Sequence, residues 1–317
     1  MNKNITPTVE GGLLTAIAVV LGLSATYLPI AGIVIEFFCP VPFVVLTVRH
    51  GLKIGAISLI VSFILLSMFT TPIVAVRLAL TMNLCGVVLG YCLSQELRAV
   101  QSFLATLLTS FFSQIILVQI LMVIMDINFA DMEISTLKET FEESFKVYES
   151  IGVEKIVIDS IRQESAKIVE LVAYLIPLIL FLLSLVNAAA TYILSKWIFK
   201  KLNMNFFAEM PRFAEWRFPT AFAYLAAFTM IGLYWGYTRD WNSIYIASLN
   251  SLFFLMIAGI IQGFAVLSFV ADKYNISKFW RRLLFILIIL NSLLLQILAM
   301  TGIFDMLFDY RKNFFKS

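Results

Sequence analysis

Nine apolar runs alternate with short polar connections along the 317 residues of the chain. Each run has the length and the scarcity of charge that a helix needs to cross the hydrocarbon core of a bilayer, which is about 30 Å thick. The runs lie near residues 11–28, 30–48, 54–70, 72–93, 99–125, 171–195, 218–238, 244–270 and 283–304. Because lipid offers no hydrogen-bond partners, such segments pair their backbone groups internally as helices. The pattern therefore predicts an all-α, polytopic transmembrane helical bundle of about eight to nine spans.

The composition agrees with this interpretation. Hydrophobic residues make up 61% of the chain and charged residues 14%, whereas soluble domains are about half apolar and about a quarter charged. Cys39, Cys85 and Cys92 all fall in apolar runs without a Cys-x-x-Cys pair, and His50 is the single histidine. These residues predict neither a disulfide framework nor a metal site. We expect no cofactor and no nucleic-acid partner.

The chain divides near residue 199. Residues 1–198 hold six apolar runs, and residues 199–317 hold a cytoplasmic connection and three more runs. The segment 126–170 is the one long hydrophilic insert, with 11 acidic and five basic residues. Leu137, Phe141, Phe145 and Tyr148 recur in it at helical spacing, and Gly152 precedes a second helical stretch. The insert is thus predicted to be an amphipathic helical pair, either resting on the outer membrane face or covering an outward-facing pocket.

Basic residues predict the orientation. Thirteen of the 23 basic residues lie near the N-terminus or in every second connection between runs, which all fall on one side of the membrane. The short connections on the opposite side hold only one basic residue, Arg239. The positive-inside rule therefore places the N-terminus and the connection 199–217 in the cytoplasm and the insert outside. The tail is the exception, since nine crossings would leave Arg311, Lys312 and Lys316 outside. Either the tail departs from the rule or one run is not a full crossing.

Two charges stand inside apolar runs. Glu36 precedes Pro40 and Pro42, which interrupt their run because proline lacks the backbone N–H. Arg77 lies at a similar depth in another run, so the two can form an ion pair. Near mid-membrane each would cost about 2.5–3.5 kcal/mol if it were unpaired. One interpretation is a polar outer pocket with Glu36, Arg77, Thr81, Gln119 and Asn250 as ligand-binding residues; the other is a structural ion pair with scattered hydrogen bonds between helices.

The connection Glu209–Pro219 reads EMPRFAEWRFP. Its aromatic and basic residues suit anchoring at the lipid headgroups. They equally suit the docking of a protein partner, with Pro211, Phe213, Trp216, Arg217 and Pro219 as the docking residues.

Four Gly-x-x-x-Gly spacings predict close helix packing, at Gly51/Gly55, Gly86/Gly90, Gly232/Gly236 and Gly259/Gly263. Signatures of enzymes are missing from the sequence, which has no Gly-x-Ser-x-Gly elbow and no Gly-x-x-x-x-Gly-Lys phosphate loop. We therefore expect a protein that is not an enzyme, with His50 as an interfacial cap.

Two motifs carry a family resemblance. Pro40-x-Pro42 with Arg49-His50-Gly51, and Met210-Pro211-x-Phe213-x-x-Trp216-Arg217-x-Pro219, resemble the YybS-like predicted membrane proteins of bacteria over most of the chain. This resemblance implies a multi-pass protein of the bacterial cytoplasmic membrane. More distantly, the first six runs resemble the S components of energy-coupling-factor vitamin transporters, and MreD-type rod-shape proteins look similar. The S-component resemblance implies an outward-open pocket for a small molecule and a transmembrane partner docked on the first helix.

Two functions follow as hypotheses. The first is a non-enzymatic transport component that binds a small solute and depends on a partner for energy. The alternative is a membrane scaffold of the cell-envelope or division machinery, with Glu209–Pro219 as the docking site. The expected partners are membrane lipids and a membrane or cytoplasmic protein.

Overall fold

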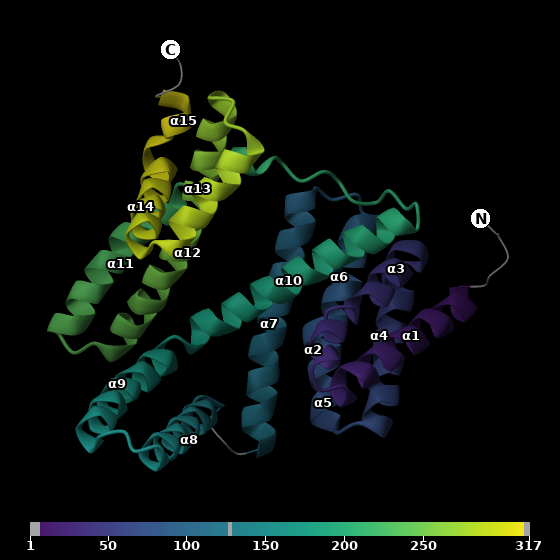
Figure 1. Cartoon of the computed structure of the whole chain (residues 1–317). Helices are drawn as coiled ribbons and strands as arrows, with labels where there is room; N and C mark the ends of the chain where they lie inside the picture. Colours follow the sequence, from purple (N-terminus) through teal and green to yellow (C-terminus); the bar gives the residue numbers. More distant parts are fainter. Residues whose placement is uncertain (1–6, 126–128, 314–317) are drawn as a thin grey trace. The chain divides into compact units, whose positions relative to one another are not determined.

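The computed structural model describes residues 7–125 and 129–313, and the regular elements it describes there are all helices (Figure 1). Among these described residues, seven helical stretches are long and apolar enough to cross a membrane, or eight if a bent pair of helices counts as one span. The predicted polytopic all-α fold is therefore confirmed. Residues 126–128, where the predicted insert begins, lie outside the described residues.

The helices before the insert are α1 (Pro7–Tyr27), α2 (Ala31–Glu36), α3 (Pro40–His50), α4 (Leu52–Phe69), α5 (Pro72–Arg77), the π-helix η1 (Leu78–Asn83), α6 (Leu84–Ser94) and α7 (Ala99–Met125). The insert and the sixth run form α8 (Phe129–Ser150), α9 (Lys155–Tyr174) and α10 (Ile176–Lys201). The rest forms the 3-10 turn η2 (Phe213–Glu215), α11 (Ala221–Thr238), α12 (Asn242–Lys273), α13 (Lys278–Leu290), α14 (Ser292–Phe308) and α15 (Tyr310–Asn313).

Two of the nine predicted runs differ from simple spans. The run 218–238 forms α11, which is not among the seven because Tyr234, Trp235 and Tyr237 reduce the hydropathy of its second half. The run 283–304 is not one helix, since α13 and α14 are bent by 106° at Asn291. Asn291 ends α13, and its side chain accepts a hydrogen bond from the Leu294 N–H at 3.1 Å to begin α14.

Contacts divide the chain into two compact units. The first comprises residues 1–162 and 179–210, and the second comprises residues 163–178 and 211–317. The predicted division near residue 199, with an S-component-like unit of six helices before it, stays a prediction.

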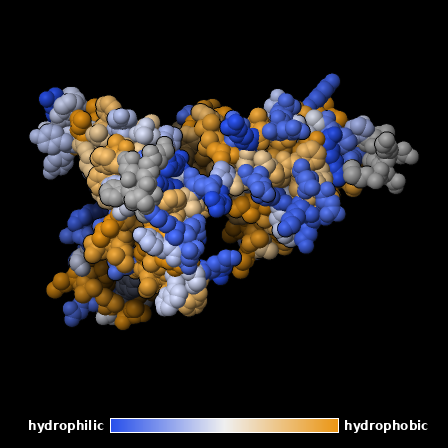
Figure 2. Space-filling view, turned by 90° about the horizontal axis from the view of Figure 1, so that it is seen from above, coloured by the Kyte–Doolittle hydropathy of each residue, from blue (hydrophilic) through white to orange (hydrophobic). Residues whose placement is uncertain are grey.

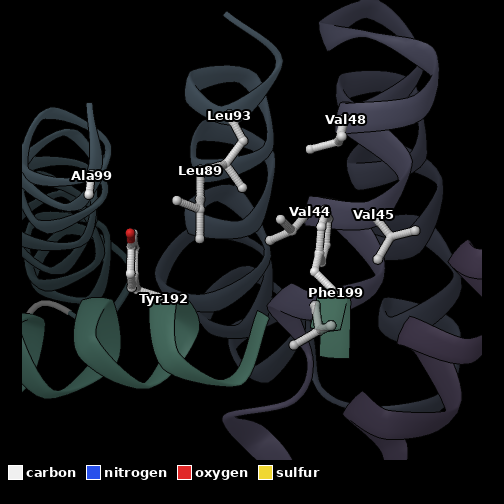
Figure 3. Packing of buried hydrophobic residues seen from close by; sticks show 9 residues of the cluster. Val44, Val45, Val48, Leu89, Leu93, Ala99, Tyr192 and Phe199 are labelled. Atoms are coloured by element: carbon white, nitrogen blue, oxygen red, sulfur yellow. The ribbon is translucent and has the colours of Figure 1, made fainter. Parts of the chain in front are cut away.

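The core of the first unit surrounds α3, whose residues from Pro40 to Val48 are all buried. A helix that is apolar on every side is expected in a core. Figure 3 shows Val44 and Val48 pointing toward Leu89 and Leu93 of α6, in the same cluster as Ala99 of α7 and Tyr192 and Phe199 of α10. Gly86 and Gly90 of α6 lie directly against the backbone of α3, which lets these helices approach closely. The buried cluster comprises Val41, Val44, Val45, Val48, Leu89, Leu93, Ala99, Tyr192 and Phe199.

The second unit packs α11 and α14 against α12. Gly232 and Gly236 of α11 meet Ser248 and Tyr245 of α12, and Gly259 and Gly263 of α12 meet Leu298, Ala299 and Gly302 of α14. The glycine spacings in both units therefore mark helix contacts, as predicted, with one exception. Gly51 has no atom within 4 Å of the position a Cβ would take; it has φ +84° and ends α3. The prediction of a packing role was wrong for Gly51, which is a turn residue.

The insert forms the predicted helical pair, with a turn at Gly152, whose φ is +84°. Phe145 and Ile158 are buried, and the Arg162 guanidinium lies 5.2 Å from the centre of the Phe145 ring. Apolar side chains are also exposed along the spans, for example Leu13, Ile60 and Phe112. Figure 2 shows hydrophobic residues over much of the surface in view, as a lipid environment requires.

Candidate functional site

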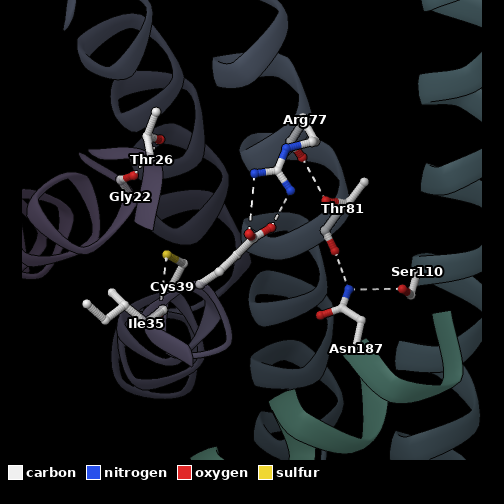
Figure 4. A network of polar contacts seen from close by, with 9 residues as sticks. Gly22, Thr26, Ile35, Cys39, Arg77, Thr81, Ser110 and Asn187 are labelled. Atoms are coloured by element: carbon white, nitrogen blue, oxygen red, sulfur yellow. Dashed lines mark hydrogen bonds and ion pairs between the residues drawn. The ribbon is translucent and has the colours of Figure 1, made fainter. Parts of the chain in front are cut away.

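The two charges inside the apolar runs meet in the first unit. Arg77 donates to both carboxylate oxygens of Glu36, through Nη1 to Oε1 and through Nη2 to Oε2 at 3.3 Å (Figure 4). The Glu36 side chain is 15% exposed and that of Arg77 is 40% exposed. The ion pair expected from the sequence is thus present. The pair is therefore accessible mainly at the Arg77 side chain.

An irregularity of the backbone follows each charge. Glu36 is the last residue of α2, and residues 37–39 form a turn before Pro40 begins α3. Arg77 is the last residue of α5, and the π-helix η1 begins at the next residue. Broken helices and π-helices in membrane proteins occur often at functional sites. The pair therefore stands where both helices depart from regular geometry.

A buried asparagine supports this π-helix. The side-chain N–H groups of Asn187 on α10 donate to the Thr81 carbonyl at 2.5 Å and to Ser110 Oγ at 3.0 Å (Figure 4). The residue is 2% exposed. Its Oδ1 has no hydrogen-bond partner among the described residues. The sequence reasoning missed Asn187, although a lone amide in the middle of the run 171–195 was a usable signal.

Of the five predicted ligand-binding residues, Glu36, Arg77 and Thr81 lie together in the first unit, and the ligand-binding role of the set stays a prediction. Thr81 joins Glu36 and Arg77, because its hydroxyl donates to the Arg77 carbonyl at 2.8 Å. Gln119 lies elsewhere on α7, on an open, shallow apolar groove lined by residues of α7 alone. Asn250 belongs to the second unit.

Asn250 has a structural task there. Its side chain donates to the Tyr174 carbonyl at 2.6 Å and accepts from the Leu178 N–H at 3.1 Å. These backbone groups flank Pro177, which has no N–H, at the junction of α9 and α10. The amide of Asn250 therefore supplies hydrogen bonds to backbone groups on both sides of this break between the helices.

The connection Glu209–Pro219 is folded upon itself. The Trp216 indole donates to the Pro211 carbonyl at 3.0 Å, and its ring lies 5.3 Å from that of Phe213. Both rings are partly exposed, at 39% and 36%. Arg217 pairs with Asp309 at 2.6 Å, and Pro219 precedes α11. The predicted docking residues thus form an ordered turn.

A buried ion pair, which the sequence reasoning also missed, holds this turn. Arg311 donates to the carbonyls of Ala214 at 2.6 Å and Trp216 at 2.9 Å, and to Asp305 at 3.1 Å. The side chains of Arg311 and Asp305 are 3% and 2% exposed. Gln262 of α12 donates to the same carboxylate at 2.6 Å. Asp305, at the end of the last apolar run, was the available signal.

Gln262 also accepts a hydrogen bond from the Phe218 N–H at 3.1 Å, so α12, α14 and the connection share one network.

At the other end of the first unit, Glu10 joins α1 to the end of α3. Its carboxylate pairs with Arg49 and lies 2.9 Å from His50 Nε2. Arg49 also lies 3.4 Å from the Met204 sulfur. The predicted role of His50 as an interfacial cap stays a prediction. No group of His, Cys, Asp and Glu among the described residues is arranged to hold a metal ion.

Comparison with known proteins decides the family. Residues 16–306 match the family described as predicted membrane protein (DUF2232). The chain belongs to this family. It is 23% identical over 322 residues to the uncharacterized protein YybS of Bacillus subtilis (strain 168), covering 98% of this chain and 99% of that protein. The resemblance to YybS-like proteins is confirmed, and no solved structure matches the chain.

The chain is thus a member of a family of predicted membrane proteins. It has several apolar helices and a bacterial relative. The resemblance to S components and MreD-type proteins stays a prediction.

Proposed function

We propose that the protein is a non-enzymatic transport component of the bacterial cytoplasmic membrane that binds a small solute and depends on a partner for energy. The observation that supports it is the Glu36–Arg77 pair, which stands between a broken helix and a π-helix. An ion pair taken out of water repays the cost of desolvation only if its geometry is good and further hydrogen bonds satisfy its remaining donors and acceptors. Here 40% of the Arg77 side chain is accessible.

The chemistry of the pair favours a zwitterionic solute. A carboxylate of the solute would bind the planar fork of Arg77 in two parallel hydrogen bonds. An ammonium group of the same solute would bind the Glu36 carboxylate. Such an exchange keeps both charges compensated, whereas a solute of one sign would leave one of them unpaired.

Two features support dependence on a partner. The sequence has no phosphate-binding Gly-x-x-x-x-Gly-Lys loop. On α1, Gly12 and Ala16 form an exposed small-residue face with nothing close to Gly12, whereas Gly11, Ala18 and Gly22 are buried within the unit. Small residues on an open face allow a second transmembrane helix to approach closely.

Solute binding can be tested on the protein purified in mild detergent. We expect zwitterionic amino acids or short peptides to raise its thermal unfolding temperature and to appear bound by native mass spectrometry. Glu36→Gln and Arg77→Gln should each abolish this response. Arg162→Gln is the matched control, because it removes a charge from an exposed pair with Glu142. A response that both site variants retain would refute the assignment.

The scaffold function remains the second candidate because the Glu209–Pro219 connection forms a turn held by its own contacts and by Arg311. Trp216 and Phe213 present exposed rings, while Arg311 fixes the backbone beneath them. Rigid aromatic anchors of this kind suit interface hot spots.

Conservative changes separate docking from lipid anchoring. Under docking, Trp216→Tyr and Arg217→Lys should weaken co-purification of a partner at unchanged thermal stability. Full retention of every partner, also in Trp216→Ala, would identify the connection as a lipid anchor.

A further inference from the structure

Both ends of the α13–α14 pair lie at one place in the second unit. At its start, Arg281 pairs with Asp272, near the end of α12, at 2.5 Å. At its end, Arg311 donates to the carbonyls of Ala214 and Trp216. The two places are linked through α12, because the turn η2, which contains Ala214, packs against this helix.

The dimensions of the pair do not suit a crossing. α13 has 13 residues and α14 has 17, which correspond to lengths of about 20 and 26 Å. The hydrocarbon core is about 30 Å thick. The bend of 106° exceeds a right angle, so α14 turns back instead of continuing the path of α13 (Figure 1).

The elbow is suited to an apolar environment. The Asn291 N–H donates to the Ile288 carbonyl at 3.3 Å, its side chain accepts from Leu294, and its carbonyl accepts from the Leu295 N–H at 2.9 Å. Leu290 and Leu293 beside it are exposed by 78% and 64%. An irregular backbone survives at membrane depth only if its polar groups are satisfied, and Asn291 contributes three hydrogen bonds at this break.

We propose that α13 and α14 form a re-entrant hairpin, which enters and leaves the membrane on the side of the Glu209–Pro219 connection. The C-terminal tail is then on that same side. This arrangement removes the conflict with the positive-inside rule, because Arg311, Lys312 and Lys316 join the other basic connections. The inference does not depend on the proposed transport function.

The residues at this end support the assignment. Phe279 and Trp280, at the start of α13, are exposed by 69% and 62%. Lys278 and Arg282 beside them are exposed as well. Aromatic and basic residues gather at the level of the headgroups. α13 therefore enters the membrane through an interface belt that it shares with Phe213 and Trp216.

Reporter fusions test the side of the tail. Green fluorescent protein fluoresces after cytoplasmic folding, and alkaline phosphatase is active only outside. Each is fused after residue 317 of the full chain, with insertions after residues 205 and 240 as references. We expect the tail to report as position 205 does and position 240 to report the opposite. A tail that reports as position 240 does would overturn the hairpin.

A second measurement tests whether the elbow enters the membrane. Ser292→Cys and Lys278→Cys are made in the otherwise unchanged chain, whose three native cysteines are buried. A membrane-impermeant maleimide should label Lys278→Cys in opened vesicles at least tenfold faster than Ser292→Cys. Equal labelling of the two would place the pair on the surface and overturn the proposal, whatever the fusions show.

Discussion

The buried pair Asp305–Arg311 leads to the sharpest prediction about stability. Arg311→Met keeps an unbranched side chain of moderate length but leaves the Asp305 carboxylate without its cation. Because both side chains are at most 3% exposed, this loss should lower the free energy of unfolding by about 3–5 kcal/mol. The Ala214 and Trp216 carbonyls also lose their charged donor.

Asp305→Asn should relieve part of that loss. The neutral amide can still accept from Gln262, and the double variant leaves no uncompensated charge in the buried network. We therefore expect Asp305→Asn/Arg311→Met to cost less than the two single changes together, with a coupling energy of about 1–3 kcal/mol. The assay is reversible unfolding in mixed micelles of mild detergent and dodecyl sulfate.

The neighbouring pair Arg217–Asp309 is the matched control. Its side chains are 39% and 30% exposed and its closest contact is 2.6 Å, so solvent should screen it. Its coupling energy should not exceed about 1 kcal/mol. Equal coupling in the two pairs, or additive losses for Asp305 and Arg311, would refute the argument from burial.

Three further predictions concern the first unit and the orientation. Glu36→Gln and Arg77→Gln should each lower the thermal unfolding temperature in detergent, and the double change should lower it by less than the sum; additive losses would mean that the side chains do not touch. Asn187→Ala should cost about 1–3 kcal/mol, because the buried Thr81 carbonyl loses a donor; a loss no greater than that of the exposed Asn205→Ala, measured in the same way, would contradict this role. Asn205→Cys should be labelled only from the cytoplasm and Glu154→Cys only from outside; external labelling of position 205 would reverse the topology.

Run length and apolar character predicted most of the spanning helices, because a spanning helix is a local property of the sequence, but they did not predict the bend at Asn291. The same reasoning predicted the break before Pro40 and the turn at Gly152, since both depend on the backbone of one residue. The depth of Glu36 and Arg77 predicted their pairing, because two charges at one level in lipid have few other partners.

Contacts between distant segments could not be predicted in this way. Asn250 and Asn187 are both amides in apolar runs, and only the structure shows that one repairs a break at Pro177 and the other binds a π-helix. Arg311 was read as part of a basic tail, yet it is buried against Asp305. Whether a charge is exposed depends on how α14 packs on α12, which the sequence pattern does not specify.

The π-helix η1 also sets the rotational register between the two halves of its span. In a π-helix the hydrogen bonds join residues five apart instead of four, so a π turn within an α-helix accommodates one extra residue. One residue corresponds to a rotation of about 100° in an α-helix. Arg77 precedes this extra residue, and Gly86 and Gly90, which face α3, follow it. Deleting Ala79 would restore a regular helix, but only by turning either the charge away from Glu36 or the glycines away from α3. The insertion thus lets one helix present its ion pair and its packing surface in directions that a regular helix of this sequence would not combine.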